Sequence, residues 1–383
     1  MTQELIHSAN HTAVSRSSAP SARRVSTTAQ VEADWGHFTF KPEPHRWHAQ
    51  ATNLREVPKH RGAPVMPVSH RWGIVLAGDD DERMQEVTQW VSGDNRPKQF
   101  CRLFSGYTLL EETRHRAERS LPPEQILYSV TQAHAQYYLP SLAGRPGRRI
   151  VQPSNKGTAP AILSALVHIA QTDPNAIVAV LPCDHYFSSE RAFMTNVESA
   201  FRVAEEQSHP IVLLGVAPES PEVDCGWIEI GEEIDGRSRL FRVDGFRQKP
   251  PLALAQSLLR SGSLWNTSVM VGHVHTFLEM AQATIPSLLQ VFQSMKVTSL
   301  LDGEIRIPDS IYDRIAPTDF SRHMLALATD RLLALRLENI GWSDLGDPYR
   351  ILVTLLEKNG SLPSWASLWP DPEAVPRTSA VST

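Results

Sequence analysis

The sequence is poor in the residues that form disulfide frameworks and structural zinc sites. Its three cysteines, Cys101, Cys183 and Cys225, lie far apart among 383 residues, and their spacing fits neither kind of site. Few and isolated cysteines are usual in a reducing compartment. Because no N-terminal signal peptide is apparent either, we expect a cytoplasmic protein.

The sequence also lacks long apolar runs and a strong excess of one charge. No run approaches the roughly 20 residues that a transmembrane helix needs, so no membrane association is expected. The 37 basic and 42 acidic side chains give a formal net charge of -5, which offers no electrostatic reason to expect a nucleic-acid partner. With 41% hydrophobic residues, the composition is that of an ordinary globular protein.

Two end segments show no apolar periodicity. Residues 1–45 are rich in Ser, Thr, Ala and Arg and are predicted to form a disordered arm. Residues 360–383 contain four prolines and are predicted to form a loose tail. Residues 46–359, between these ends, are predicted to form one folded domain.

Within this domain, apolar strands alternate with amphipathic helices. The expected buried strands are Trp72–Ala77, Ile126–Thr131, Ala176–Pro182 and Ile211–Val216. The clearest helices are expected at Thr158–Thr172 and Glu190–Gln207. This alternation predicts an α/β fold with a doubly wound, mostly parallel sheet, in which ligands bind at the carboxyl ends of the strands.

Polar residues follow two of these strands. Ala77 and Gly78 end the first strand at a turn where backbone N–H groups can hold phosphates, and Arg83 and Lys98 can add positive charge. A later strand ends at Asp184, and a carboxylate there is well placed to hold Mg²⁺ between phosphates. No G-x-G-x-x-G follows the first strand, which argues against a dinucleotide-dependent dehydrogenase.

These segments resemble the motifs of sugar-phosphate nucleotidyltransferases. The turn after the first strand, with Pro97-Lys98-Gln99-Phe100, resembles A-G-G-x-G-T-R-L followed by P-K-Q-F, and Leu181–His185 resembles L-P-A-D-H. Asn155–Ala161 resembles R-N-T-A-P-A, and Gly341–Asp347 resembles G-W-S-D-V-G, two segments of mannose-1-phosphate guanylyltransferases.

Three shorter segments match the side of such an enzyme that binds the sugar. Cys225-Gly226-Trp227-Ile228 resembles Y-G-Y-I, Arg247–Pro250 resembles E-K-P, and Trp265-Asn266-Thr267 resembles W-N-S-G. Each segment is weak alone. Their common order over some 270 residues makes chance an unsatisfactory explanation.

The resemblance implies a Rossmann-like nucleotidyltransferase without a C-terminal β-helix or cupin domain. It implies attack of a sugar 1-phosphate, here mannose 1-phosphate, on the α-phosphorus of a nucleoside triphosphate, here GTP, with release of pyrophosphate. The resemblance leaves open whether the chain forms a homo-oligomer. The implied roles are catalytic for Arg83, Lys98 and Asp184; nucleotide-binding for Ala77, Gly78, Gly157 and Thr158; sugar-phosphate-binding for Gly226, Lys249 and Asn266; and Mg²⁺-binding for Asp184 and Asp344.

The phosphate loop departs from the family pattern. Asp79 and Asp81 stand where the family has glycine, and Glu82 replaces its threonine. A carboxylate about 5 Å from a phosphate costs roughly 3 kcal/mol at an effective dielectric constant of 20. Gln248 also replaces a glutamate of the sugar side. A second hypothesis is therefore a catalytically impaired homologue that binds sugar nucleotides or regulates a partner.

Overall fold

The computed structural model describes residues 69–80, 82–234, 236–295 and 303–368. The predicted arm and Asp81 lie outside these residues. The strands are β1 (Arg71–Ala77), β2 (Ile126–Thr131), β3 (Arg148–Gln152), β4 (Ile177–Pro182), β5 (Tyr186–Phe187), β6 (Ile211–Val216), β7 (Gly226–Glu233), β8 (Leu240–Gln248), β9 (Leu264–His273), β10 (Glu304–Arg306), β11 (Leu332–Leu337) and β12 (Trp342–Ser343). All four predicted strands are present, within one residue of their expected ends.

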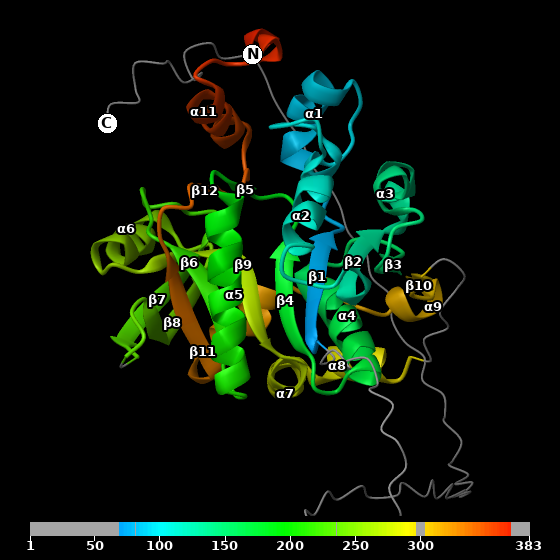
Figure 1. The fold of residues 1–383 in the computed structure, drawn as a ribbon, viewed down its shortest axis with the longest axis vertical. Coiled ribbons are helices and arrows are strands. Elements are labelled where there is room, and N and C mark those ends of the chain that lie inside the picture. The colour runs from blue at the N-terminus through cyan, green and yellow to red at the C-terminus, as the bar shows by residue number, and fades with distance from the viewer. Residues whose placement is uncertain (1–68, 81, 235, 296–302, 369–383) are drawn as a thin grey trace, which may run out of the picture. The chain divides into compact units, whose positions relative to one another are not determined.

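Ten of these strands form one sheet in the order β10-β3-β2-β1-β4-β9-β6-β11-β8-β7 (Figure 1). The half from β10 to β4 is parallel throughout. The prediction of a mostly parallel sheet is wrong for the other half, where β9 runs antiparallel to β4 and β6, and β8 runs antiparallel to β11 and β7. The sheet is therefore mixed.

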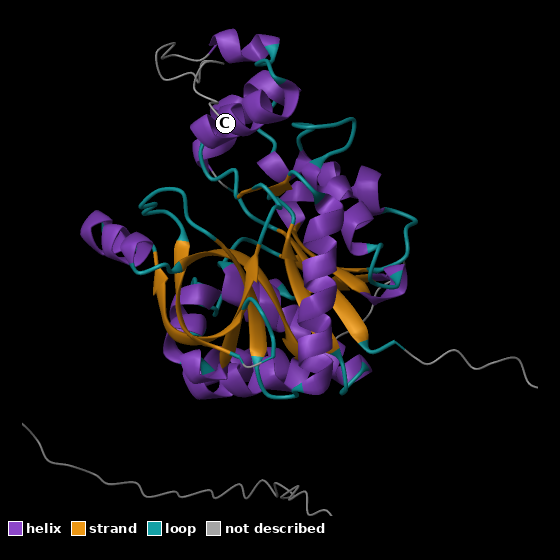
Figure 2. Cartoon of the chain, turned by 60° about the vertical axis from the view of Figure 1, so that its left-hand side comes forward, coloured by secondary structure: helices purple, strands orange, loops and turns teal. Residues whose placement is uncertain are grey.

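Helices cover both faces of the sheet (Figure 2). The α-helices are α1 (Gln85–Ser92), α2 (Leu109–Ala117), α3 (Ala135–Leu142), α4 (Thr158–Thr172), α5 (Glu190–Glu206), α6 (Leu252–Arg260), α7 (Val274–Thr284), α8 (Pro286–Gln293), α9 (Asp309–Tyr312), α10 (Phe320–His323) and α11 (Pro348–Asn359). One apolar cluster joins the sheet to α4, α7 and α8, and a second joins its other face to α2, α3 and α5.

Side-chain alternation along β1 explains why the sheet is covered on both faces. Trp72 and Ile74 belong to one apolar cluster, whereas Val75 and Ala77 belong to the other. Successive side chains of a strand point to opposite faces, so an apolar run of this kind is stable only when both faces are covered. The predicted helices α4 and α5 each pack on one face of the sheet.

A small cap lies above the carboxyl ends of the central parallel strands (Figure 1). Helices α1 and α11 pack together through Val87, Ile351 and Leu355. The predicted tail contributes to this cap, since Trp365 stacks on Trp90 with ring centroids 6.5 Å apart. The short β5–β12 pairing brings the chain around Asp344 next to the chain that follows Asp184.

Among the described residues, no helix is both long and apolar enough to cross a membrane. The three cysteines are buried and unpaired, in agreement with the absence of a disulfide framework in the sequence.

Candidate active site

A cavity of about 400 Å³ opens where β1, β2 and β4 end. Five predicted site residues line it, namely Gly78, Gly157, Thr158, Asp184 and Lys249. Ala77 is buried just below and belongs to the core. The close approach of β1 to β2 requires Gly78, because a Cβ atom there would lie 2.9 Å from Thr131 Oγ1. The sequence therefore predicted the position of the cavity.

Asp184 sits in this cavity beside a buried ammonium group. Its Oδ2 lies 3.2 Å from Lys98 Nζ, and the Lys98 side chain is only 4% exposed. Burial by itself would raise the pKa of Asp184, but the positive charge of Lys98, the neighbouring His185 and the hydrogen bonds to the carboxylate together outweigh it and hold that pKa below its ordinary value. Asp184 is thus ionised at neutral pH and keeps a negative charge at the carboxyl end of β4.

Lys98 is fixed by protein groups on several sides. Besides Asp184, it contacts the carbonyl oxygens of Asp344, 3.2 Å away, and Leu345, 2.9 Å away. An ammonium group has three protons to donate, and these three acceptors match them. The structure therefore places Lys98 beneath Asp184 as its anchor, rather than at the cavity surface where the resemblance implies a phosphate contact.

His185 is a packing residue. Its Nδ1 lies 3.3 Å from the indole Nε1 of Trp342, and the two rings meet edge to face. Burial lowers the pKa of His185 below its ordinary value, so the ring is neutral at pH 7 and accepts this hydrogen bond.

Two carboxylates of the acidic loop, Asp79 and Asp80, have partners within the protein. Asp80 pairs with the buried His134, with Oδ1 and Nε2 2.5 Å apart. Asp79 lines the cavity, and its Oδ1 accepts a hydrogen bond from Asn155 Nδ2 at 3.3 Å. Asp80 is thus held by His134, whereas Asp79 stays at the cavity, where its negative charge opposes a phosphate.

Gly157 and Thr158 begin α4 and also fix the chain around residue 318. Gly157 has φ +90°, and a Cβ atom there would lie 2.6 Å from the carbonyl oxygen of Thr318. The Thr158 hydroxyl accepts a hydrogen bond from the Phe320 N–H at 2.8 Å. Both residues line the cavity, but close packing within the protein already explains the glycine.

The predicted sugar side is built from β7, β8 and β9. A Cβ atom on Gly226 would lie 2.8 Å from Gln248 Oε1 and 3.4 Å from Asn266 Cβ, so the three residues are neighbours. Asn266 is buried, and neither Asn266 Oδ1 nor Gln248 Oε1 has a hydrogen-bond partner in the described residues. Buried acceptors of this kind usually meet a donor, and sugar hydroxyls are suitable donors.

Two residues at this edge have left-handed backbone conformations. Lys249 has φ +50°, and Ser268, which stands where the family has glycine, has φ +58°. Such a conformation costs about 1–2 kcal/mol for a residue with a side chain. Both residues line the cavity, as strained residues at functional sites often do.

Arg83 and Lys249 meet one carboxylate. Asp224 lies between them, with Oδ2 3.6 Å from Arg83 Nη1 and Oδ1 3.7 Å from Lys249 Nζ. All three side chains are about half exposed, so these pairs are weak and easily broken. The structure therefore brings together the two cations that the resemblance assigns to different substrates.

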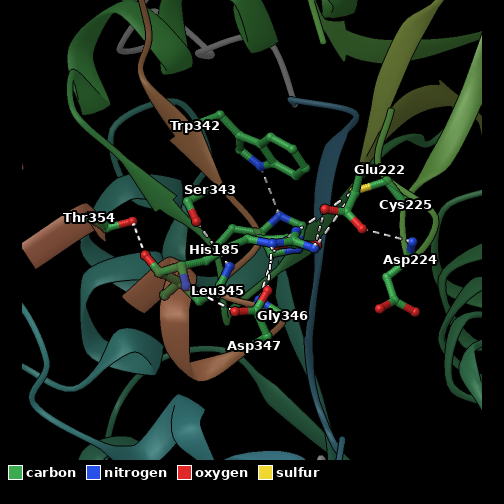
Figure 3. A network of polar contacts seen from close by, with 12 residues as sticks. His185, Glu222, Asp224, Cys225, Trp342, Ser343, Leu345, Gly346, Asp347 and Thr354 are labelled. Atoms are coloured by element: carbon green, nitrogen blue, oxygen red, sulfur yellow. Dashed lines mark hydrogen bonds and ion pairs between the residues drawn. The ribbon is translucent and has the colours of Figure 1, made fainter. Parts of the chain in front are cut away.

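Asp344 faces an arginine. Arg350 on α11 donates to Asp344 Oδ1. The N–H of Gly346, which is labelled in Figure 3, donates to the same oxygen at 3.0 Å. Among the described residues, no group of three or more His, Cys, Asp or Glu side chains is placed to hold a metal ion. A Mg²⁺ ion here would need oxygen ligands from its substrates.

Sequence reasoning missed several polar residues of the cavity. Gln152, at the end of β3, is fixed by Tyr312 Oη, which donates to its Oε1 at 2.6 Å, and by Ser129 Oγ, 3.1 Å from its Nε2. Gln99, Ser268 and Asp319 also line the cavity. Gln152 ends a parallel strand, and this position could have identified it.

Comparison with known proteins agrees with this geometry. The family model described as nucleotidyl transferase matches residues 72–356. The chain belongs to the nucleotidyl transferase family. A mannose-1-phosphate guanylyltransferase of Escherichia coli (strain K12) is 27% identical to it over 316 residues, which cover 79% of this chain and 60% of that protein. The xanthan biosynthesis protein XanB of Xanthomonas campestris pv. campestris (strain B100) is 26% identical over 291 residues, which cover 75% of this chain. The matched region spans about 60% of the length of these relatives.

Two solved structures align with this α/β fold. The crystal structure described as mannose-1-phosphate geranyltransferase from Thermus thermophilus aligns with a TM-score of 0.64 and 26% identity, over 75% of this chain and 79% of that one. A structure described as mannose-6-phosphate isomerase from Helicobacter pylori aligns with a TM-score of 0.58 at 20% identity, over 71% of this chain and 99% of that one, and this shows the fold alone.

Proposed function

We propose that this chain joins a sugar 1-phosphate to a nucleoside triphosphate, with mannose 1-phosphate and GTP as the preferred pair. A phosphate oxygen of the sugar 1-phosphate attacks the α-phosphorus of the triphosphate, and the bond to pyrophosphate breaks. The names of the relatives support this choice of substrates. The observation that carries the proposal is the cavity at the carboxyl strand ends, in which the ionised Asp184 and the cationic Lys249 both take part.

The chain's own residues act by binding and orientation. Lys249 holds the sugar phosphate at the rim of the cavity, while Arg83 approaches the triphosphate once both have left Asp224. Asn266 and Gln248 accept hydrogen bonds from sugar hydroxyls through their unpartnered oxygens. No protein nucleophile is required, so catalysis rests on positioning and on neutralising the charge of the phosphates.

Asp184 suits a magnesium ion. Its Oδ1 lies 3.8 Å from the neutral His185 ring, and a carboxylate oxygen of this kind is a ligand that Mg²⁺ accepts together with phosphate oxygens and waters. When bound, the ion neutralises negative charge on the phosphates. Lys98 keeps the Asp184 carboxylate ionised and fixed before the ion binds.

We propose the cytoplasm as the compartment of this chain, because the three cysteines are unpaired.

The test is pyrophosphate release from purified chain with Mg²⁺, using a matrix of nucleoside triphosphates and sugar 1-phosphates. We expect the highest kcat/KM for GTP with mannose 1-phosphate. A clear preference for UTP or dTTP with glucose 1-phosphate would contradict the substrate assignment while leaving the reaction class intact.

The second hypothesis, a binding or regulatory homologue, stays open because Asp79 faces the cavity. It predicts no pyrophosphate release with any pair of substrates, together with measurable binding of GDP-mannose in a calorimeter. Restoring glycine at Asp79 and Asp81 would then raise the rate of release.

A further inference from the structure

Ser268 combines a strained backbone with a place at the cavity. Among the described residues other than glycine that have a positive φ, Lys249 and Ser268 line the cavity. Ser268 has φ +58°, a conformation that glycine adopts without the crowding that a Cβ atom brings. Strain that persists at a functional site suggests that the side chain has a function there.

The strain belongs to a bulge in β9. Between the regular pairs on either side, residues 267–269 of β9 stand opposite Leu214 of β6 alone. The fully buried Thr267 holds this bulge, because its hydroxyl donates to the Leu214 carbonyl at 2.6 Å and accepts from the Val269 N–H at 3.4 Å. A bulge next to an active site often turns a side chain in a direction that a regular strand would not give it.

The bulge lies where the two halves of the sheet meet. β9 runs antiparallel to β4, with Met270 opposite Val180. The bulge therefore reaches the carboxyl end of β4, and Ser268 lines the same cavity as Pro182 and Asp184. This position is next to the predicted sugar side, since Asn266 precedes Ser268 by two residues on the same strand.

The Ser268 hydroxyl is available to a ligand. It makes no hydrogen bond with any of the residues that the structure describes. Asn266 Oδ1 and Gln248 Oε1, on the same side of the cavity, are buried acceptors that likewise lack a partner there. A sugar hydroxyl that donates to one of these oxygens still has lone pairs, and a serine hydroxyl can donate to them. Ser268 thus supplies a donor where these two side chains supply acceptors.

We propose that Ser268 is a specificity-determining residue for the sugar, and that its hydroxyl donates a hydrogen bond to one hydroxyl oxygen of the bound sugar. Glycine at this position would relieve the backbone strain but would supply no donor. The inference rests on the proposed function, because it concerns the sugar of that reaction, and it is tested by binding without turnover.

The test measures the dissociation constants of GDP-mannose and GDP for the full chain by isothermal titration calorimetry. Ser268→Ala keeps the Cβ atom and the strain but removes the hydroxyl. We expect it to weaken GDP-mannose binding about three- to ten-fold, as the loss of one hydrogen bond does. GDP carries no sugar, so its binding is expected to stay within about two-fold of that of the unaltered chain.

Ser268→Gly separates binding from stability. It is expected to weaken GDP-mannose binding as Ser268→Ala does, while the midpoint of its urea denaturation rises because glycine relieves the strain. Damage to the fold would lower that midpoint instead. Asn339→Gly is the matched control, since Asn339 is exposed, has φ +55° and lies outside the cavity lining. It is expected to bind GDP-mannose as the unaltered chain does.

Deoxy derivatives of GDP-mannose, each lacking one sugar hydroxyl, identify the contact. The loss of affinity in Ser268→Ala is expected to disappear with the derivative that lacks the contacted hydroxyl and to persist with the others. An equal loss with every derivative would overturn the inference, and so would an unchanged affinity of Ser268→Ala for GDP-mannose.

Pyrophosphate release is measured separately, so that the two proposals can fail independently. A chain that shows the expected binding pattern and no release refutes catalysis and leaves the role of Ser268 intact. Release with the same KM for mannose 1-phosphate in Ser268→Ala and in the unaltered chain refutes the role of Ser268 alone.

Discussion

The contacts of individual side chains show which of the residues predicted from the sequence lie at the cavity. Asp184 was predicted because it follows an apolar strand, and Lys249 because its segment resembles a family motif; the structure places both at the cavity. It did not identify Arg350 or Asp224, since their importance comes from ion pairs between segments more than 100 residues apart. Long-range pairs of this kind leave no local signal in a single sequence.

At the residue scale, Asp224 pairs with both of the proposed phosphate-binding cations, Arg83 and Lys249, so a substrate phosphate would have to displace it. Each exposed pair contributes at most about 1 kcal/mol, which corresponds to about five-fold in affinity. We therefore expect Asp224→Asn to lower the KM for the sugar phosphate two- to five-fold and to leave kcat within two-fold. Initial rates of pyrophosphate release measure both constants. The exposed Asp244→Asn serves as control. A KM that rises instead would mean that Asp224 holds Lys249 in its working position.

Also at the residue scale, His168 makes stability depend on pH. Burial, with the nearby charge of Arg148, lowers its pKa from 6.5 to about 4, and its Nε2 accepts from Arg148 at 2.8 Å. Between pH 6.5 and 4 the unfolded chain binds a proton that the folded chain does not, so stability falls as pH falls through this range. On going from pH 7 to 5, this loss amounts to at most about 2 kcal/mol.

Urea denaturation at pH 7 and pH 5 tests this prediction. The variant His168→Gln keeps an acceptor for Arg148 and is expected to lose less stability between the two pH values than the unaltered chain. Replacement of the exposed His209 by Gln controls for the loss of one histidine. An equal pH dependence in the His168→Gln variant would contradict the assignment.

At the scale of elements, the apolar patterns of the sequence predicted strands and helices, but not how these elements pack where they meet. Strands β1, β2, β4 and β6 and helices α4 and α5 were predictable, because each contains a continuous apolar run or stripe. The direction of β9 was not, since an apolar strand has the same pattern whether its neighbour is parallel or antiparallel. The start of α4 was interpreted as a site near the nucleotide, and the packing of Gly157 against Thr318 was not predicted.

The junction between α4 and the chain before α10 supplies the prediction at this scale. A Cβ atom at Gly157 meets the Thr318 carbonyl at 2.6 Å, and φ is +90°. Overpacking and backbone strain together are expected to make Gly157→Ala less stable by about 2–4 kcal/mol. Gly262→Ala is the matched control, because Gly262 has φ +76° and open space around its Cβ position. Urea denaturation of both variants separates the cost of the steric clash with Thr318, which only Gly157→Ala introduces, from the cost of the positive φ, which both variants share. Equal losses would show that the contact with Thr318 contributes nothing.

At the scale of the whole molecule, the residues predicted to bind the nucleotide lie in the parallel half of the sheet, and those predicted to bind the sugar phosphate lie in the mixed half. Gly78, Gly157 and Asp184 belong to the first half, whereas Gly226, Lys249 and Asn266 belong to the second. The order of the motifs in the sequence already assigned the two groups to separate segments of the chain, and their binding roles stay predictions. The cap formed by α1 and α11 was not predictable, because its core joins residues from both ends of the described chain.

The central claim is that Asp184 serves nucleotidyl transfer in this cavity. The most direct measurement is the initial rate of pyrophosphate release from GTP, mannose 1-phosphate and Mg²⁺ by the unaltered chain, by Asp184→Asn and by Asp330→Asn. Asp330 is exposed and lies before β11, away from the cavity. The account predicts release by the unaltered chain, a loss of about 100-fold or more in Asp184→Asn, and a change within two-fold in Asp330→Asn. Release that persists at the full rate in Asp184→Asn, or no release from the unaltered chain, would contradict it.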